Sequence, residues 1–275
     1  MPPKKIGILA GGGELPRRIS DACVRNDQEF HVVVFEGQGD PEAFKDSPHD
    51  IIRLGAGGGT IKCLRKHGCT HLVMAGAIRR PSLSELRPDW WGIKFFASSG
   101  AQALGDDGLL RALIGALEGE DFNVIGADEI VPELLMTKGI ITKTPAAELP
   151  KQDIACAINA ARSLGQQDIG QAAVAANGQV IAKEGPGGTD AMLRELAAAK
   201  NAGGVLAKTL KPEQERRVDL PTIGPDTIIN AHTAGLQGVV VEAGNAFLLE
   251  RDKTIRTAND LGVFLVGTDA AGDWL

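Results

Sequence analysis

The chain has 275 residues, with 29 lysines and arginines against 35 aspartates and glutamates, which gives a formal net charge of −6. Hydrophobic residues make up 43% and charged residues 23%, ordinary values for a globular protein that exclude a largely disordered chain. The acidic balance argues against non-specific nucleic-acid binding, which needs a basic surface. A chain of this length can bury its own cores, so we expect its four cysteines to be reduced cytosolic thiols rather than a disulfide framework.

The first half of the chain alternates short apolar runs with longer amphipathic segments. Continuous apolar runs are typical of strands in a parallel sheet that is covered on both faces, and the amphipathic segments predict helices. The expected strands are residues 6–10, 31–35, 50–54, 71–76 and 122–126, and the expected helices are residues 16–26, 60–67 and 106–119. This alternation predicts an α/β fold whose N-terminal domain, residues 1–136, contains a Rossmann-like parallel sheet.

The second half predicts a mixed α/β domain. Residues 137–150 contain Thr-Lys-Gly, Thr-Pro and Leu-Pro, which predict a linker, and the second domain is expected to cover residues 151–275. Asn177-Gly178 lies between two apolar runs, the pattern that most strongly predicts a β-hairpin. The expected strands are residues 169–175, 179–183, 205–209, 238–242, 247–250 and 264–267, and the expected helices are residues 151–164, 190–200, 225–235 and 254–261.

A glycine-rich turn, Gly11-Gly12-Gly13, follows the first expected strand. Backbone N–H groups and the dipole of the next helix can bind phosphate oxygens at such a turn. As a dinucleotide-binding fingerprint the turn is incomplete, because Pro16 stands where the third glycine is expected, although Glu36 has the spacing of the ribose-binding acid. We favour a phosphate-binding turn over a purely structural one, and NAD is a weaker alternative.

Two other glycine-rich segments precede expected helices. Residues 55–60 lack the Lys-Ser/Thr ending of a P-loop, so we interpret them as a turn with Thr60 near a helix cap. The second segment contains Gly188, Thr189 and Asp190. Propensity alone favours a helix cap there, and the alternative is an anion site in which Asp190 holds a cation or water.

The segment KTLKPEQERRVDLPTIG, residues 208–224, is the most unusual in the chain. A charge run usually forms a solvated surface, and that interpretation suits Glu213, Glu215 and Arg216. It does not suit Asp219, which lies between two apolar residues ahead of a proline. A carboxylate beside groups that neutralise a diphosphate suits metal-assisted hydrolysis of a phosphoanhydride. The neighbouring donors of that kind are Lys208, Lys211, Gln214 and Arg217.

Four aromatic residues fall within residues 90–96. On a helix Trp91 and Phe95 share a face, and we favour a core or dimer contact over a wall for acyl chains or an interfacial anchor beside Lys94. The histidines and cysteines show no metal-ligand spacing, so core or surface roles are expected for them. These residues are His31, His49, His67, His71, His232, Cys23, Cys63, Cys69 and Cys156.

The chain resembles the LpxI family of UDP-2,3-diacylglucosamine pyrophosphatases, which act in lipid A biosynthesis in some Gram-negative bacteria. The resemblance runs from residue 6 to beyond residue 260, and its most specific part is the last of the matching stretches. These stretches are IGILAGGGELP (6–16), AGAIRRPSLSEL (75–86), GDDGLLR (105–111), IVPELL (130–135), DIGQAAV (168–174), GTDAML (188–193) and KPEQERRVDLPTIG (211–224).

The resemblance implies a cytoplasmic hydrolase, peripheral to the inner membrane, that uses Mg²⁺ or another divalent cation. It would cleave UDP-2,3-diacylglucosamine into UMP and 2,3-diacylglucosamine 1-phosphate (lipid X). It also implies a homodimer, transient contact with a membrane surface and a lipid nucleotide held between two domains, the second of which carries the RVDLPTIG motif.

The same resemblance implies roles for particular residues. Asp219 matches the family's essential acidic position and would bind metal or activate water, with Asp190 as a second metal ligand. The residues expected to line the substrate are Gly12, Gly13, Ala75, Gly76, Gly188, Thr189, Asp190, Lys208, Lys211, Gln214, Arg217 and Thr222.

Three positions depart from the family pattern. Gly187 stands where a glutamate is expected, Lys183 where an apolar residue is commoner, and Asp128 where histidine is frequent. Two other functions stay open: a nicotinamide-dinucleotide-dependent oxidoreductase, suggested by Gly11, Gly13 and Glu36, and a non-enzymatic protein that binds a lipid or a nucleotide sugar.

Overall fold

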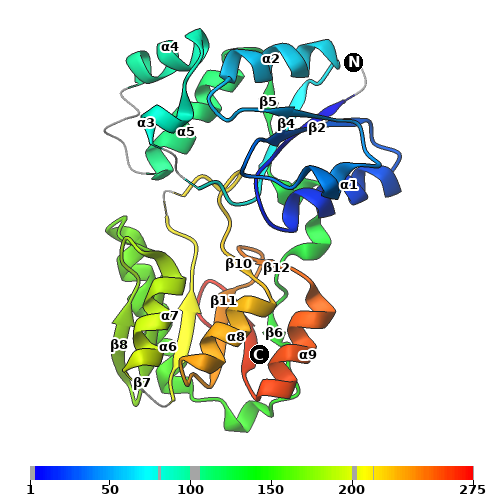
Figure 1. Cartoon of the computed structure of the whole chain (residues 1–275). Helices are drawn as coiled ribbons and strands as arrows, with labels where there is room; N and C mark the ends of the chain where they lie inside the picture. The colour runs from blue at the N-terminus through cyan, green and yellow to red at the C-terminus, as the bar shows by residue number, and fades with distance from the viewer. Residues whose placement is uncertain (1–3, 80–81, 100–105, 200–202, 213, 275) are drawn as a thin grey trace. The chain divides into compact units, whose positions relative to one another are not determined.

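The computed structural model describes residues 4–79, 82–99, 106–199, 203–212 and 214–274, and within it the chain divides into two compact α/β units (Figure 1). Unit one comprises the chain up to Glu133 together with Glu215–Asp219, and unit two comprises Leu134–Gln214 and the chain from Leu220 onward. The predicted fold class, a parallel-sheet domain plus a mixed α/β domain, is confirmed.

Unit one is built on a five-stranded sheet in the order β3-β2-β1-β4-β5, in which every neighbouring pair is parallel. This is the Rossmann-like arrangement that the sequence predicts. The strands are β1 (Ile6–Ala10), β2 (Phe30–Phe35), β3 (His49–Ile52), β4 (His71–Ala75) and β5 (Asn123–Val124). The helices are α1 (Leu15–Arg25), α2 (Gly57–Lys66), α3 (Leu83–Leu86), α4 (Trp90–Ser99) and α5 (Asp106–Glu118).

Helices cover both faces of this sheet, which explains why β1 is buried along its whole length. On one face Leu9 and Val33 of the sheet pack against Ile61 of α2 and Ile114 of α5. Helix α1 lies on the opposite face (Figure 1) and buries Ile19 there. The alternation of strand residues between the two faces therefore decides which side chains meet α2.

Helix α2 begins at Gly57, three residues before the expected start at Thr60. The first turn needs glycine because the ring of Trp91 packs directly against it, and a Cβ on Gly57 would overlap that ring. The interpretation of residues 55–60 as a turn was therefore wrong for residues 57–60. Asp89 supports this helix start, because its Oδ2 accepts a hydrogen bond from Gly59 N at 3.2 Å.

Unit two is built on a mixed six-stranded sheet in the order β6-β13-β11-β9-β7-β8. Strands β9, β11 and β13 are parallel, whereas β6, β7 and β8 pair antiparallel with their neighbours. The strands are β6 (Gly139–Ile140), β7 (Ala172–Ala176), β8 (Gln179–Lys183), β9 (Val205–Lys208), β11 (Gly238–Glu242) and β13 (Phe264–Thr268), with β10 (Thr222–Ile223) and β12 (Phe247–Leu248) in a separate pair. The helices are α6 (Lys151–Gln166), α7 (Gly188–Ala198), α8 (Pro225–Thr233) and α9 (Arg251–Leu261).

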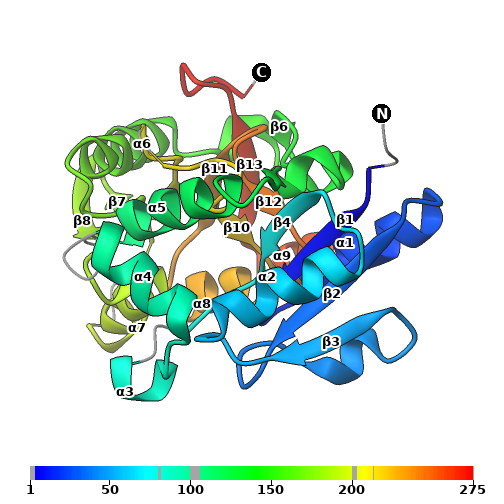
Figure 2. The same ribbon diagram turned by 90° about the horizontal axis from the view of Figure 1, so that it is seen from above.

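The sheet of unit two is also covered on both faces (Figure 2). Helix α6 packs Ile154 and Ile158 against Val205 and Val240 on one face. Helices α7, α8 and α9 bury side chains such as Leu193 against the other. This accounts for the nearly continuous apolar character of the central strands.

The hairpin predicted at Asn177-Gly178 is confirmed, because it joins the antiparallel strands β7 and β8. Both residues have positive φ, 52° and 73°, as a two-residue type I′ turn requires. The segment 137–150, expected to be a linker, contains β6, which pairs with β13 and places this segment within unit two. Part of the RVDLPTIG motif, which was expected in the C-terminal domain, belongs to unit one, because Glu215–Asp219 are assigned there.

The aromatic segment 90–96 forms most of α4 and has two different faces. Trp91 and Phe95 stack with ring centroids 5.7 Å apart, and Phe95 is buried, so the predicted core contact is confirmed for this pair. Trp90 is 80% exposed and Ile93 is 49% exposed. Within the described ranges, no helix has the length and apolar character needed to cross a bilayer.

Candidate functional site

Four of the predicted site residues lie together where β1 and β4 end: Gly12, Gly13, Ala75 and Gly76. Gly12 N donates to Ala77 O at 2.8 Å, and Ala77 N donates back to Gly12 O at 2.9 Å. A Cβ on Gly76, whose φ is +89°, would lie 2.5 Å from Gly12 O. Because Gly12 and Gly76 have no side chains, the backbone segments that follow β1 and β4 can come into contact. Gly13 is different, because a Cβ placed on it would meet nothing within 4 Å.

In unit two, Thr189 belongs to a buried polar network centred on Glu184. The Thr189 hydroxyl donates to Glu184 Oε1 at 2.8 Å, and Gln171 N donates to Glu184 Oε2 at 2.6 Å. Glu184 is 8% exposed, so both oxygens of a buried carboxylate are satisfied by these donors. Helix α7 begins at Gly188 with no side-chain cap, so the cap interpretation of Thr189 and Asp190 was wrong.

Glu184 was not identified from the sequence. Its only local signal is its position as a charged residue directly after strand β8. The structure gives Glu184 a role, since it fixes the hydroxyl of Thr189, which was predicted to line the substrate.

Asp190 and Lys208 lie at the same edge of the unit-two sheet as Glu184. Lys208 ends β9 and is paired with Ala172, whose carbonyl accepts a hydrogen bond from Glu184 N at 2.9 Å. Asp190 is exposed in the first turn of α7, and its Oδ1 accepts a hydrogen bond from Asn230 Nδ2 at 3.3 Å. An exposed carboxylate beside this network can be reached by a cation.

The remaining predicted residues of unit two follow β9. Lys211 Nζ lies 2.9 Å from Asp168 Oδ1, and Lys211 N donates to Gln214 Oε1 at 3.1 Å. Gln214 is buried, whereas Thr222 is half-buried at the start of β10 and donates to Leu220 O at 3.3 Å. Lys211 and Gln214 are therefore neighbours, and contact of either with a substrate stays a prediction.

Arg217 is held by two carboxylates of unit one. Its guanidinium donates to both oxygens of Glu215 at 2.9 Å each and to Glu118 Oε1 at 2.7 Å. The hydrogen bonds that Arg217 donates to Glu215 and Glu118 raise the pKa of Arg217, and the same bonds to Glu215 lower the pKa of Glu215 despite partial burial. Substrate contact by Arg217 stays a prediction, beside the structural contacts that its guanidinium makes.

The neighbouring Arg216 pairs with Asp128, whose Oδ2 lies 3.0 Å from Nη2. The interpretation of Glu215 and Arg216 as a solvated face was therefore wrong, because both are half-buried and ion-paired. Glu213, included in the same interpretation, lies outside the described residues. The departure at position 128 acquires a physical role, since Asp128 helps to hold the loop.

Asp219 ends the loop Glu215–Asp219 that belongs to unit one. Asp219 N donates to Glu215 O at 3.1 Å, and Val218 packs against the apolar core of unit one. The ion pairs of the two preceding arginines and the packing of Val218 thus fix the backbone that carries the Asp219 carboxylate. Of the two predicted metal ligands, Asp219 belongs to unit one and Asp190 to unit two.

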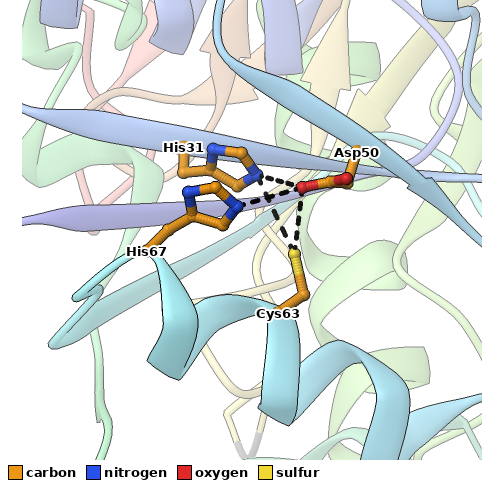
Figure 3. Close-up of side chains that lie close together, drawn as sticks. All are labelled: His31, Asp50, Cys63 and His67. Atoms are coloured by element: carbon orange, nitrogen blue, oxygen red, sulfur yellow. Dashed lines mark hydrogen bonds and ion pairs between the residues drawn. The ribbon is translucent and has the colours of Figure 1, made fainter.

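A second group of polar side chains lies in unit one, and we refer to it as the histidine–cysteine cluster (Figure 3). It consists of His31 of β2, Asp50 of β3, Cys63 of α2 and His67, which caps the C-terminus of α2. Asp50 Oδ2 lies 2.9 Å from His31 Nε2, 3.2 Å from His67 Nε2 and 3.3 Å from Cys63 Sγ. The two imidazole rings are stacked, with centroids 3.7 Å apart and planes 8° from parallel.

Burial and mutual hydrogen bonds set the protonation states in this cluster. Burial lowers the pKa of His31, and burial together with the nearby Asp50 carboxylate raises the pKa of Cys63 to about 12. Partial burial opposes ionisation of Asp50, but hydrogen bonds from Cys63 and His31 hold its pKa below the usual range. The protein alone therefore favours a neutral His31, a protonated Cys63 thiol and an ionised Asp50.

Only core or surface roles were expected for His31, Cys63 and His67, but the structure brings their ligand atoms and that of Asp50 within 4.8 Å of one another. The one signal in the sequence was the spacing of Cys63 and His67, which places both residues on one side of a helix. His31 and Asp50 reach them only through the pairing of β2 with β3.

Comparisons with known proteins cover nearly the whole chain. Residues 5–134 match the LpxI N-terminal domain, and residues 137–266 match the LpxI C-terminal domain. The chain is 40% identical to the UDP-2,3-diacylglucosamine pyrophosphatase LpxI of Caulobacter vibrioides, in an alignment that covers 97% of this chain and 98% of that protein.

Solved structures give much weaker similarities. CobK precorrin-6A reductase aligns over 97% of this chain and 89% of its own, with 14% identity and a TM-score of 0.34. The Bordetella bronchiseptica enzyme WbmG in complex with NAD aligns over 42% of this chain and 34% of its own, with 19% identity and a TM-score of 0.26. Scores this low support no argument about ligands. The two domain matches and the full-length relative are decisive, and the chain belongs to the LpxI family.

Proposed function

We propose that this protein hydrolyses the pyrophosphate bond of UDP-2,3-diacylglucosamine and releases UMP and 2,3-diacylglucosamine 1-phosphate. The observation that carries the proposal is the 40% identity, over 98% of its length, to a relative that is named as the pyrophosphatase for this substrate. In this reaction water adds to one phosphorus and one P–O bond of the anhydride breaks. The bridging oxygen leaves with the other phosphate. Close to two protons are released at neutral pH, because each phosphate monoester has a second pKa of about 6.

The side chains of unit two support phosphoanhydride chemistry. Thr189 and Lys208 lie at the carboxyl edge of β9, where parallel strands of α/β proteins commonly present ligand-binding groups. Lysine ammonium groups neutralise diphosphate oxygens, and a hydroxyl held by a buried carboxylate has a fixed orientation. We assign Lys208 and Lys211 to the phosphates and Thr189 to substrate positioning.

The residues of unit one support binding of the nucleotide and activation of water. Gly13, with open space beside it, permits close approach of the backbone to a ligand. We propose that the Asp219 carboxylate accepts the proton of the attacking water, because ion pairs fix the loop that carries this carboxylate.

The family resemblance implies a divalent cation, and the donor chemistry fits Mg²⁺. Asp190 and Asp219 offer carboxylate oxygens, which Mg²⁺ prefers to nitrogen or sulfur ligands. When bound, the ion supplies Lewis-acid stabilisation of charge on the phosphate oxygens. We propose that the anchored carboxylate of Asp219 holds it, and Asp190 stays the second ligand that the family resemblance implies.

A cytoplasmic location, a homodimer and transient contact with the inner membrane remain predictions that accompany this function. Light scattering tests the oligomeric state, and sedimentation with vesicles tests membrane contact. A substrate with two acyl chains would be collected from a membrane, and the exposed Trp90 and Ile93 of α4 are the described side chains that we propose for that contact.

The test is to incubate the purified protein with UDP-2,3-diacylglucosamine and Mg²⁺, with and without chelator, and to follow UMP and lipid products by mass spectrometry. The proposal expects UMP only when a divalent cation is present. Reaction in ¹⁸O-labelled water shows which phosphorus is attacked, because that product alone carries the label.

Other outcomes would favour the alternatives. Release of UDP in place of UMP would mean glycosidic cleavage and contradict the proposal. Bound substrate without turnover, with several cations tried, would favour a binding protein. Fluorescence titration with NAD(H) and NADP(H) tests the oxidoreductase alternative, which requires binding of one of these cofactors.

A further inference from the structure

The histidine–cysteine cluster lies away from the residues that we assign to hydrolysis in unit one. His31 and Asp50 are each the second residue of their strands, β2 and β3, and Cys63 and His67 lie in the last turns of α2. Gly13 instead follows the carboxyl end of β1. The cluster therefore lies near the amino ends of the unit-one strands, and the glycine turn lies at their carboxyl ends. The proposed hydrolysis does not explain why these four side chains meet.

The spacing of their polar atoms matches that of ligands around a tetrahedral metal ion. With bonds of about 2.0 Å to nitrogen or oxygen and about 2.3 Å to sulfur, neighbouring ligand atoms lie about 3.3 Å apart, or about 3.5 Å where one is sulfur. The distances from Asp50 Oδ2 to His31 Nε2, His67 Nε2 and Cys63 Sγ are 2.9, 3.2 and 3.3 Å, and Cys63 Sγ lies 3.8 Å from His31 Nε2. A small movement of the side chains would complete the tetrahedron.

Hydrogen bonding alone satisfies this group poorly. Three polar atoms approach the single oxygen Asp50 Oδ2, which has lone pairs for about two good hydrogen bonds. His67 Nε2 is buried and, although close to that oxygen, makes no hydrogen bond of acceptable geometry to any described residue. A buried nitrogen without a partner is costly, and a metal ion would use its lone pair.

We propose that His31, Asp50, Cys63 and His67 bind Zn²⁺. Imidazole nitrogen, thiolate sulfur and carboxylate oxygen are the three kinds of ligand that zinc takes in proteins, and four of them fill a tetrahedral site. Mg²⁺ is excluded by the same donors, because it prefers oxygen ligands in octahedral geometry. Binding replaces the thiol proton of Cys63, which leaves to solvent, and involves no change of oxidation state.

The side chains are already arranged for metal binding. His31 is 3% exposed and stacks on His67, so both rings are held with their Nε2 atoms directed toward Asp50 (Figure 3). β3 is one of the two edge strands of the unit-one sheet, and zinc joins it to β2 and to α2. With all four positions filled by protein ligands, the ion stabilises this edge and has no open position for catalysis. This inference does not depend on the proposed hydrolysis.

The test is titration of the full-length, chelator-treated and reduced protein with Co²⁺, which reports tetrahedral thiolate coordination by its absorption spectrum. We expect one equivalent per chain, a thiolate-to-cobalt charge-transfer band and the visible bands of tetrahedral cobalt. Stoichiometric Zn²⁺ should bleach the spectrum, whereas a large excess of Mg²⁺ should not. Absence of a charge-transfer band in the wild-type protein overturns the proposal.

Variants identify the ligands. Cys63→Ser should lose the charge-transfer band, and Cys156→Ser, which changes another half-buried cysteine, should retain it. His67→Gln should weaken Co²⁺ binding by more than about tenfold, because loss of even a residue that only hydrogen-bonds a metal ligand typically costs that much, and His71→Gln is its control. If Cys63→Ser does not fold, as judged by circular dichroism, His67→Gln decides the matter, because unchanged Co²⁺ affinity in that variant also overturns the proposal.

Discussion

The two α/β units carry different kinds of polar side chain at different edges of their sheets. In unit one, nitrogen, sulfur and oxygen atoms of four side chains gather near the amino ends of β2 and β3. In unit two, Glu184, Thr189 and Lys208 gather at the carboxyl end of β9, and the polar atoms of these three side chains are oxygens and a lysine ammonium. The first set suits a soft or borderline cation, and the second suits phosphate and a hard cation.

On our two proposals, this difference separates structural from catalytic metal binding through the ligand atoms alone. A thiolate and two imidazoles discriminate against Mg²⁺, while carboxylates such as Asp190 and Asp219 accept it. The two proposed cations should therefore have separable effects, one on the stability of unit one and one on turnover.

The largest expected effect comes from removing all divalent cations and adding them back singly. Hydrolysis should fall to background with chelator and return with Mg²⁺ but not with one equivalent of Zn²⁺. Zn²⁺ should instead raise the melting temperature, because a ligand that binds only the native state adds about 2.7 kcal/mol of stability at 100 times its Kd. Parallel assays of UMP release and thermal unfolding check this. Full recovery of turnover with one equivalent of Zn²⁺ alone would show that the two sites are not distinct.

The next largest effect is expected from Asp219→Asn, which removes the proton acceptor with little change in size. General acid–base groups contribute about 10²–10⁴-fold to rates, so kcat should fall at least about a hundredfold. The melting temperature and the Co²⁺ spectrum should not change. Asp260→Asn, which changes an exposed aspartate of α9, is the matched control. Wild-type kcat in Asp219→Asn would remove Asp219 from the mechanism.

Local patterns predicted most regular elements of the fold. The apolar runs of β1, β8 and β11 have the expected bounds, and Asn177-Gly178 forms the hairpin because both residues tolerate positive φ. Strand β6 was not predicted, because its two residues form a strand only through pairing with β13, more than a hundred residues away. A pattern confined to neighbouring residues contains no information on such pairing.

The candidate site was less predictable for the same reason. The residues after β1 and β4 could be placed together from the parallel sheet, but Glu184 and the anchoring of Arg217 by Glu118 depend on long-range contacts. The histidine–cysteine cluster unites three segments, and only the spacing of Cys63 and His67 was visible locally. Asp219 was singled out by its charge between apolar neighbours, while its place in unit one depends on the packing of Val218.

A smaller effect is expected from Glu184→Ala, which tests the network of unit two by itself. The substitution leaves Gln171 N and the Thr189 hydroxyl without their buried acceptor, which costs about 1–3 kcal/mol in the free energy of unfolding. KM should also rise, because Thr189 loses the contact that orients it. Urea denaturation and steady-state kinetics measure the two effects, and Glu195→Ala on the exposed side of α7 is the control. Equal stability of the two variants would mean that the Glu184 network contributes nothing.

The smallest effect is expected at α4, where the comparison extends to the surface of unit one. Trp90 and Ile93 are 80% and 49% exposed on a helix whose other face is packed, whereas Val24 is 64% exposed on α1. Full burial of such a side chain is worth about 1.5–3 kcal/mol, and an interface buries only part of it, so Trp90→Ser should weaken binding to anionic vesicles a few-fold. Val24→Ser should have no effect, since α1 covers the opposite face of the sheet. A helix can bind a flat surface only through the side chains on the face that it presents. Equal losses of vesicle binding in both variants would therefore mean that membrane contact depends on general surface hydrophobicity rather than on α4.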